Sequence, residues 1–159
     1  RLEDEGLVES SPYNGSQVIQ LTKETIADRY ALREAVECQV ARILAKEITP
    51  EQQDQLRRLA EDLDNASRAP DDEDAFWDLH CRFHMAMAKA AAKPSLEQAL
   101  HRIGLFQFLQ RSVKTQKLSR QPIPPDLHRR IVVGIATRDP DSAEKAMRDH
   151  LYFSGLMRR

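Results

Sequence analysis

The stretch from Leu32 to Leu44, which reads LREAVECQVARIL, decides the fold of this chain. Its apolar residues recur every three or four positions, which is the spacing of one face of an α-helix. These positions are Leu32, Ala35, Val36, Val40, Ile43 and Leu44. We therefore predict a long amphipathic helix from about Lys23 to Glu47, with this stripe facing a hydrophobic core.

Five more helical segments follow, and none of the chain after Thr22 reads convincingly as a strand. The second helix restarts at Thr49-Pro50-Glu51-Gln52, where Thr and Gln form a capping box and Pro suits the first turn. The others carry apolar residues at helical spacing around Phe83, Leu100, Ile131 and Met147. The Leu100 segment extends through a second apolar group, made up of Leu105, Phe106, Phe108 and Leu109. Long amphipathic helices with short loops predict an all-α fold, an antiparallel bundle of about six helices.

The first 21 residues differ from the rest of the chain. Residues 1–7 read as the end of a helix, and two short strand-like segments flank Pro12-Tyr13-Asn14-Gly15. Asn-Gly favours the positive φ angles of a tight hairpin turn. A helix end and one hairpin do not make a domain. We interpret residues 1–21 as the remnant of a neighbouring domain and residues 22–159 as the main domain.

Charge and composition limit the functions that this segment can have. The chain has 24 basic and 25 acidic residues, so it lacks the positive excess that binding to DNA phosphates requires. Cys38 and Cys81 have no paired spacing, which is typical of thiols in a reducing compartment. The chain also lacks a long apolar run and a signal peptide. We expect a cytoplasmic protein that does not enter a membrane.

Four of the five histidines point to a metal site. His80 and His84 are four residues apart, so both lie on one face of a helix, while His128 and His150 share faces with apolar residues. A single histidine on such a face is more often a hydrogen-bonded core residue. Four inward-facing histidines on three helices would each need a separate buried partner, and this favours a shared metal ion. His101 lies on another face, and we interpret it as structural or as part of an interface.

Arg33 is the second candidate functional residue. At about 100° per residue, Arg33 projects between Val40 and Leu44, in line with the core stripe. A buried guanidinium needs a negative partner, and its planar fork suits a carboxylate. Two interpretations remain open at this stage. Arg33 forms an internal ion pair with Glu37 or another acid, or it holds an anionic ligand near the metal.

These motifs together resemble the FCD family, the C-terminal effector-binding domain of FadR-type regulators in the GntR superfamily. The resemblance covers nearly the whole chain: residues 2–8 and 14–18 are similar to the last turn and wing of a winged-helix domain, and Tyr30 to Glu37 to the first effector-domain helix. Phe83-His84, His128 to Ile131, and Arg138 to Leu151 complete the order. The spacing of His84, His128 and His150 also resembles that of the family's metal-binding histidines.

The resemblance implies a function and a ligand set. It implies a homodimer and a divalent metal held by His84, His128 and His150, and helical spacing adds His80 to this set. A shell of four nitrogens suits a transition metal, zinc first, with nickel, copper or iron as alternatives. A small organic acid is the implied effector, with Arg33 as its carboxylate contact. Operator DNA would be bound only through the missing winged-helix domain. Metal-binding members usually have Asp where this chain has His80, so one negative charge is lost. A second departure is Ala92-Lys93-Pro94, where Gly-Asn-Pro is common.

Two other functions remain as alternatives. Histidines in a helical bundle also suit a mononuclear metalloenzyme, although the sequence shows no general base beside them. A closed shell of four histidines would instead suit a structural metal in a dimerisation module.

Overall fold

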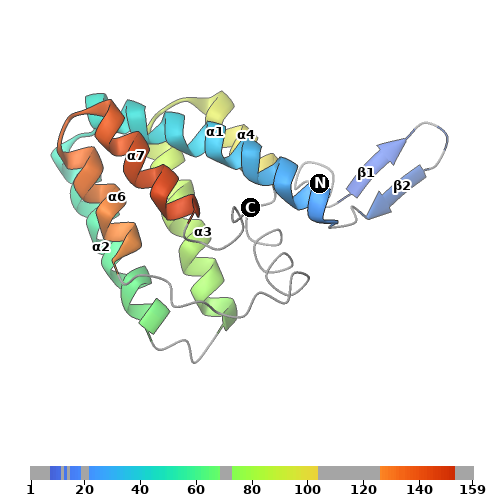
Figure 1. Cartoon of the computed structure of the whole chain (residues 1–159), viewed down its shortest axis with the longest axis horizontal. Coiled ribbons are helices and arrows are strands. Elements are labelled where there is room, and N and C mark those ends of the chain that lie inside the picture. The colour runs from blue at the N-terminus through green and yellow to red at the C-terminus, as the bar shows by residue number, and fades with distance from the viewer. Residues whose placement is uncertain are drawn as a thin grey trace.

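The computed structural model of the chain describes residues 8–11, 13, 15–18, 22–68, 73–103 and 126–152. In these ranges it contains six helices and two strands, namely β1 (Val8–Ser11), β2 (Gly15–Val18), α1 (Lys23–Glu47), α2 (Pro50–Arg68), α3 (Glu73–Ala90), α4 (Pro94–Arg102), α6 (Leu127–Ala136) and α7 (Pro140–Leu151) (Figure 1). The predicted all-α fold with about six helices is confirmed for this part of the chain. The predictions for residues 1–7, 19–21 and 104–110 lie outside the described residues.

Helices α2 and α7 begin where local sequence signals place their starts. The Thr49 backbone N–H donates to Gln52 Oε1 at 3.0 Å, and the Gln52 N–H donates to Thr49 Oγ1 at 3.3 Å, so the predicted capping box is present. At the start of α7, the Asp139 carboxylate accepts from the backbone N–H groups of Asp141 and Ser142. These side chains satisfy first-turn donors that have no partner inside their own helix.

The helices pack as a ring in which neighbours in space are not always neighbours in sequence. Helix α1 packs against α3, α6 and α7, while α2 packs against α3 and α6, and α6 packs against α7 (Figure 1). Helix α4 covers α1 and α3. At Gly134 the two last helices approach closely, since a Cβ there would lie 2.9 Å from the Ala146 Cβ. This arrangement points one face each of α3, α6 and α7 toward a common interior.

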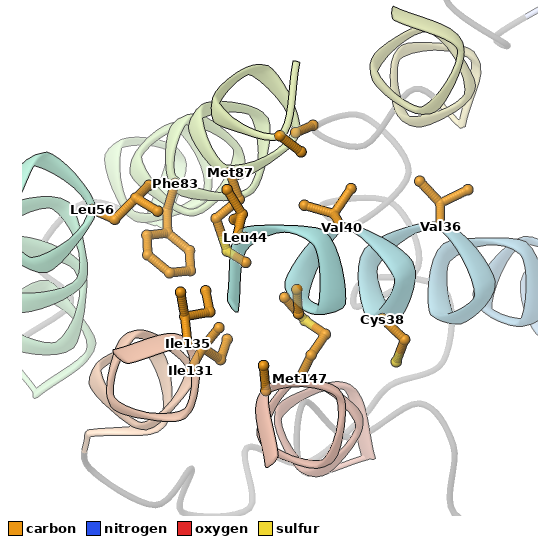
Figure 2. Close-up of a cluster of buried hydrophobic side chains, with 14 of the residues drawn as sticks. Val36, Cys38, Val40, Leu44, Leu56, Phe83, Met87, Ile131, Ile135 and Met147 are labelled. Carbon is orange, nitrogen blue, oxygen red and sulfur yellow. The ribbon is translucent and has the colours of Figure 1, made fainter. Parts of the chain in front are cut away.

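One end of that interior is purely hydrophobic. Figure 2 shows Leu44 of α1 between Phe83 and Met87 of α3 on one side and Ile131 and Ile135 of α6 on the other. All five side chains are at most 1% exposed. Burial of large aliphatic and aromatic side chains contributes about 1.5–3 kcal/mol each before the entropy of ordering is counted. This end therefore holds the helices that carry the histidines.

The sequence prediction was wrong for Leu32, which is 49% exposed, and for Ala35, which is also exposed rather than part of the core. The buried stripe of α1 instead runs through Tyr30, Arg33, Glu37 and Leu44. Leu32 lies about 100° around the helix from Arg33, so it projects to the edge of that stripe. The burial of Arg33 in this stripe agrees with its predicted position between Val40 and Leu44.

Strands β1 and β2 pair antiparallel, with Val8 opposite Val18 and Ser11 opposite Gly15. They lie beyond the N-terminal end of α1 and apart from the helical ring (Figure 1). Gly15 has a φ of 67°, a left-handed conformation that glycine adopts readily.

Among the described helices, none has the length and apolar character needed to cross a membrane.

Candidate metal centre

The four histidines singled out in the sequence come together in the interior of the ring. Helix α3 provides His80 and His84, α6 provides His128, and α7 provides His150. All four are buried, with exposed fractions between 1% and 3%. The fifth histidine, His101, is exposed at the end of α4.

The distances within this cluster fit one metal ion. One nitrogen from each imidazole can be chosen so that all four lie within 4.8 Å of one another. With metal–nitrogen bonds of about 2.1 Å, ligands sit about 3.4 Å apart around a tetrahedral ion and at most about 4.2 Å apart around an octahedral one. Small side-chain movements therefore suffice to bring all four nitrogens onto one ion.

Several imidazole nitrogens have no partner within the described part of the protein. They are His80 Nδ1, His128 Nε2 and both ring nitrogens of His150. A buried polar atom without a hydrogen bond costs about 1–3 kcal/mol. Four such atoms in one cluster fit a site that is completed by a metal ion.

Arg33 and Glu37 of α1 both contact the imidazole of His84. The Arg33 guanidinium is fully buried, and its Nε pairs with Glu37 Oε1. The other oxygen, Oε2, accepts a hydrogen bond from His84 Nδ1, and Arg33 Nη2 lies 3.3 Å from His84 Nε2. Arg33 Nη1 is buried without a hydrogen-bond partner among the described residues. Thus the internal ion pair with Glu37 exists, and one donor of the same guanidinium remains available to an anion.

His128 has a carboxylate partner that the sequence interpretation missed. Asp64 of α2 is 2% exposed, and its Oδ1 lies 2.7 Å from His128 Nδ1. A signal was present, because Asp64 follows Ala60 by four residues and shares the buried face of α2. Metal-bound histidines usually donate their other N–H to a carboxylate in this way, which fixes the ring orientation and the tautomer.

The protonation states favour ligation. Burial lowers the pKa of His80 and His150 well below the usual range, and neighbouring histidines lower it further. Burial also lowers the pKa of His84 to about 4, although Glu37 opposes this. Burial alone would raise the pKa of Glu37, but Arg33 and His84 bring it down to about 2. These three imidazoles are therefore neutral at pH 7, as metal ligands must be.

Comparison with known proteins identifies a matching family and several relatives. A model of the FCD domain matches residues 28–153. The Escherichia coli K12 protein "HTH-type transcriptional repressor RspR" is 28% identical over 160 residues, which cover 95% of this chain and 66% of RspR. A Shigella flexneri protein described as an HTH-type transcriptional regulator, YdfH, matches to the same extent. The chain thus spans about two thirds of the length of these relatives.

Solved structures show the same fold. The Streptococcus agalactiae protein GntR aligns with a TM-score of 0.65 and 21% identity over 96% of this chain and 75% of its own. The E. coli protein McbR/YncC aligns with a TM-score of 0.74 and 13% identity over 95% of this chain and 72% of its own.

The fold and these likenesses define the class of protein, a helical domain of transcription regulators. The chain belongs to the FCD family, and its curated relatives are described as HTH-type transcriptional regulators. The curated relatives reported above are described as transcriptional regulators and not as enzymes, which favours the regulator interpretation over the metalloenzyme one.

Proposed function

We propose that this domain senses a small organic acid at a divalent transition metal held by His80, His84, His128 and His150. The observation that carries the proposal is that one nitrogen from each of the four imidazoles lies within 4.8 Å of the others. The rings of His80, His128 and His150 also carry buried nitrogens with no hydrogen-bond partner among the described residues. Four nitrogen donors suit zinc first, with nickel, copper or iron as alternatives, and suit magnesium or calcium poorly. The bound metal would act as a Lewis acid that offers an open position to an anion.

The buried charges support an anionic effector. Apart from the histidines, the charged side chains buried in the described part are Arg33, Glu37 and Asp64, which sum to −1. A divalent ion among neutral imidazoles changes this sum to +1. Uncompensated buried charge is costly, so the loaded site favours one carboxylate. That carboxylate would contact the metal and Arg33, whose Nη1 has no hydrogen-bond partner among the described residues.

The rest of the regulator follows from the same proposal. Residues 1–21 would be the end of a winged-helix domain, with β1 and β2 as its wing, and residues 22–159 the effector domain. The whole protein would be a cytoplasmic homodimer that binds a two-fold-related operator through its winged helices. The 28% identity to a transcriptional repressor supports this organisation.

Calorimetric titration tests the coupling between metal and acid. Acetate, lactate and malate are titrated into zinc-loaded and chelator-stripped protein, and we expect at least one acid to bind the loaded form more tightly. By linkage, the same acid must raise the affinity for zinc. Equal acid affinity in both forms would make the metal structural, as in a closed four-histidine shell.

Two substitutions locate the effector contact. Arg33→Lys keeps the charge but loses the planar fork, so it should weaken acid binding. Arg42→Lys, at an α1 residue that pairs with Asp141 and Glu144 of α7, should not. His80→Asp adds a negative charge at the metal and should weaken acid binding even if zinc still binds. Unchanged acid affinity in both variants would remove Arg33 and the charge argument from the mechanism.

A complete N-terminal domain tests the regulator part of the proposal. The isolated chain should show no sequence-specific DNA binding, and the chain joined to a complete winged-helix domain should select a two-fold-related site from random DNA. Failure of the joined protein to select any sequence would contradict the proposal.

A further inference from the structure

We propose that Asp64 links occupation of the metal centre to the start of helix α6, because one carboxylate both orients His128 and caps that helix. The inference rests on the proposed metal site and adds a positioning residue to it. Asp64 lies on α2, and the helix that it caps follows much later in the chain.

The two oxygens of Asp64 have separate tasks. Oδ1 accepts from His128 Nδ1 at 2.7 Å and from the His128 backbone N–H at 3.3 Å. Oδ2 accepts from the Arg129 backbone N–H at 3.2 Å. The carboxylate therefore meets the side chain of one metal ligand and two backbone donors of the helix that carries this ligand.

Helix α6 needs this cap because its own sequence does not supply one. Asp126, the residue before the helix, has a φ of 76°, and its side chain pairs with Arg130 Nε at 3.2 Å rather than capping a backbone N–H of the first turn. The first N–H groups of a helix have no partner within the helix, and at a buried terminus they cannot rely on water. Leu127 and His128 are only 2% and 3% exposed. Asp64 provides from another helix the acceptor that an N-cap side chain normally provides.

The same contact sets the tautomer of His128. A carboxylate accepts hydrogen bonds, so Nδ1 carries the proton and Nε2 presents its lone pair to the histidine cluster. His128 Nε2 is buried without a hydrogen-bond partner among the described residues. A metal at Nε2 fixes the ring and strengthens Nδ1–H as a donor, which holds Asp64 against the two α6 amides. By reciprocity, a held carboxylate strengthens metal binding.

Glu37 is the second buried carboxylate that contacts the cluster, and its partners differ from those of Asp64. It also accepts from the Nδ1 of a histidine in the cluster, but its other partner is the Arg33 side chain on its own helix. In the described part of the chain, the Glu37 carboxylate accepts from the Arg33 and His84 side chains and from no backbone N–H. Metal binding at His84 should therefore leave helix starts unchanged, whereas binding at His128 reaches α6 and, through α6, the α7 helix packed on α1.

Amide hydrogen exchange of the full 159-residue chain, with and without zinc, tests the inference. We expect zinc to slow exchange of the His128 and Arg129 amides at least tenfold in the wild-type protein. This comparison needs no substitution, and zinc binding without slower exchange at these two amides would overturn the inference while leaving the metal site intact. Failure of the wild-type protein to bind zinc at all would overturn the proposed site as well.

Matched variants assign the effect to Asp64. Asp64→Asn retains the shape but loses charge and one acceptor, so zinc affinity should fall about 10- to 100-fold and the zinc-dependent protection of α6 should disappear at saturating zinc. Glu37→Gln should lower zinc affinity and keep the α6 protection. Asp62→Asn, an exposed acid on the same helix, should change neither quantity. Protection of α6 in Asp64→Asn equal to that of the wild type would contradict the proposed role.

Discussion

The two pairs of histidines in the cluster are built differently. His84 and His128 each hydrogen bond to a buried carboxylate, from Glu37 and Asp64 respectively. His80 and His150 have no such carboxylate among the described residues, and both nitrogens of His150 lack a partner there. The first pair is oriented before any metal binds. The second pair buries nitrogens without partners, which costs free energy in the metal-free protein. These nitrogens fit our proposal that the two histidines bind a metal.

Removal of Glu37, the carboxylate partner of His84, should cause the largest loss of stability. Glu37→Ala leaves the Arg33 guanidinium buried without its counter-ion, and breaking a buried pair in this way costs about 3–5 kcal/mol. Urea unfolding of metal-free protein measures the loss. As a control, Glu47 on the same helix forms an exposed pair with Lys93 at 3.4 Å, and Glu47→Ala should cost no more than about 1 kcal/mol. Similar losses in both variants would show that the buried network contributes no special stability.

Acid should destabilise the metal-free protein through the buried imidazoles. The folded-state pKa of His84 is about 4 against an ordinary 6.5, so its neutral form stabilises the fold above pH 6.5, and this contribution is lost as the pH falls toward 4. At about 1.4 kcal/mol per pKa unit, the loss reaches about 3 kcal/mol. Glu37, with a pKa of about 2 against 4.5, adds a loss between pH 4.5 and 2.

Urea unfolding of metal-free protein at several pH values between 7 and 4 measures this effect. His150→Leu should flatten the profile, because it removes one buried imidazole whose pKa lies below the usual range. A stability that stays constant or rises from pH 7 to pH 5 would contradict the assignment of neutral, buried histidines.

Leucine substitutions should reveal a smaller difference in stability between the two pairs of histidines. His128→Leu removes the side-chain donor to Asp64 and should destabilise the metal-free protein by about 1–3 kcal/mol. His150→Leu removes two partnerless buried nitrogens, so the metal-free protein should be equally or more stable. Both variants should bind zinc more weakly. Equal destabilisation by the two substitutions would mean that His150 has a partner that offsets its burial.

The sequence predicted the helices and the inward direction of the four histidines because both depend on angles around single helices. Their convergence on one site was expected from the shared need for a buried partner and from the resemblance to the FCD family. Arg33, His84 and His128 project inward by helical spacing, and the structure buries all three. The same reasoning failed at Leu32, where the apolar pattern was extended past the edge of the buried stripe. It could not find the Asp64–His128 contact, because helical spacing gives the face of a residue and not the helix that will face it.

Zinc titration of chelator-stripped protein tests the central claim most directly. The account predicts one zinc ion per chain, followed with a competing chromophoric chelator. In His80→Ala/His150→Ala protein the affinity should fall by at least about 100-fold, since two of four ligands are lost, while His101→Ala protein should bind as the wild type does. Absence of zinc binding, or an affinity that is unchanged in the double variant, would contradict the account.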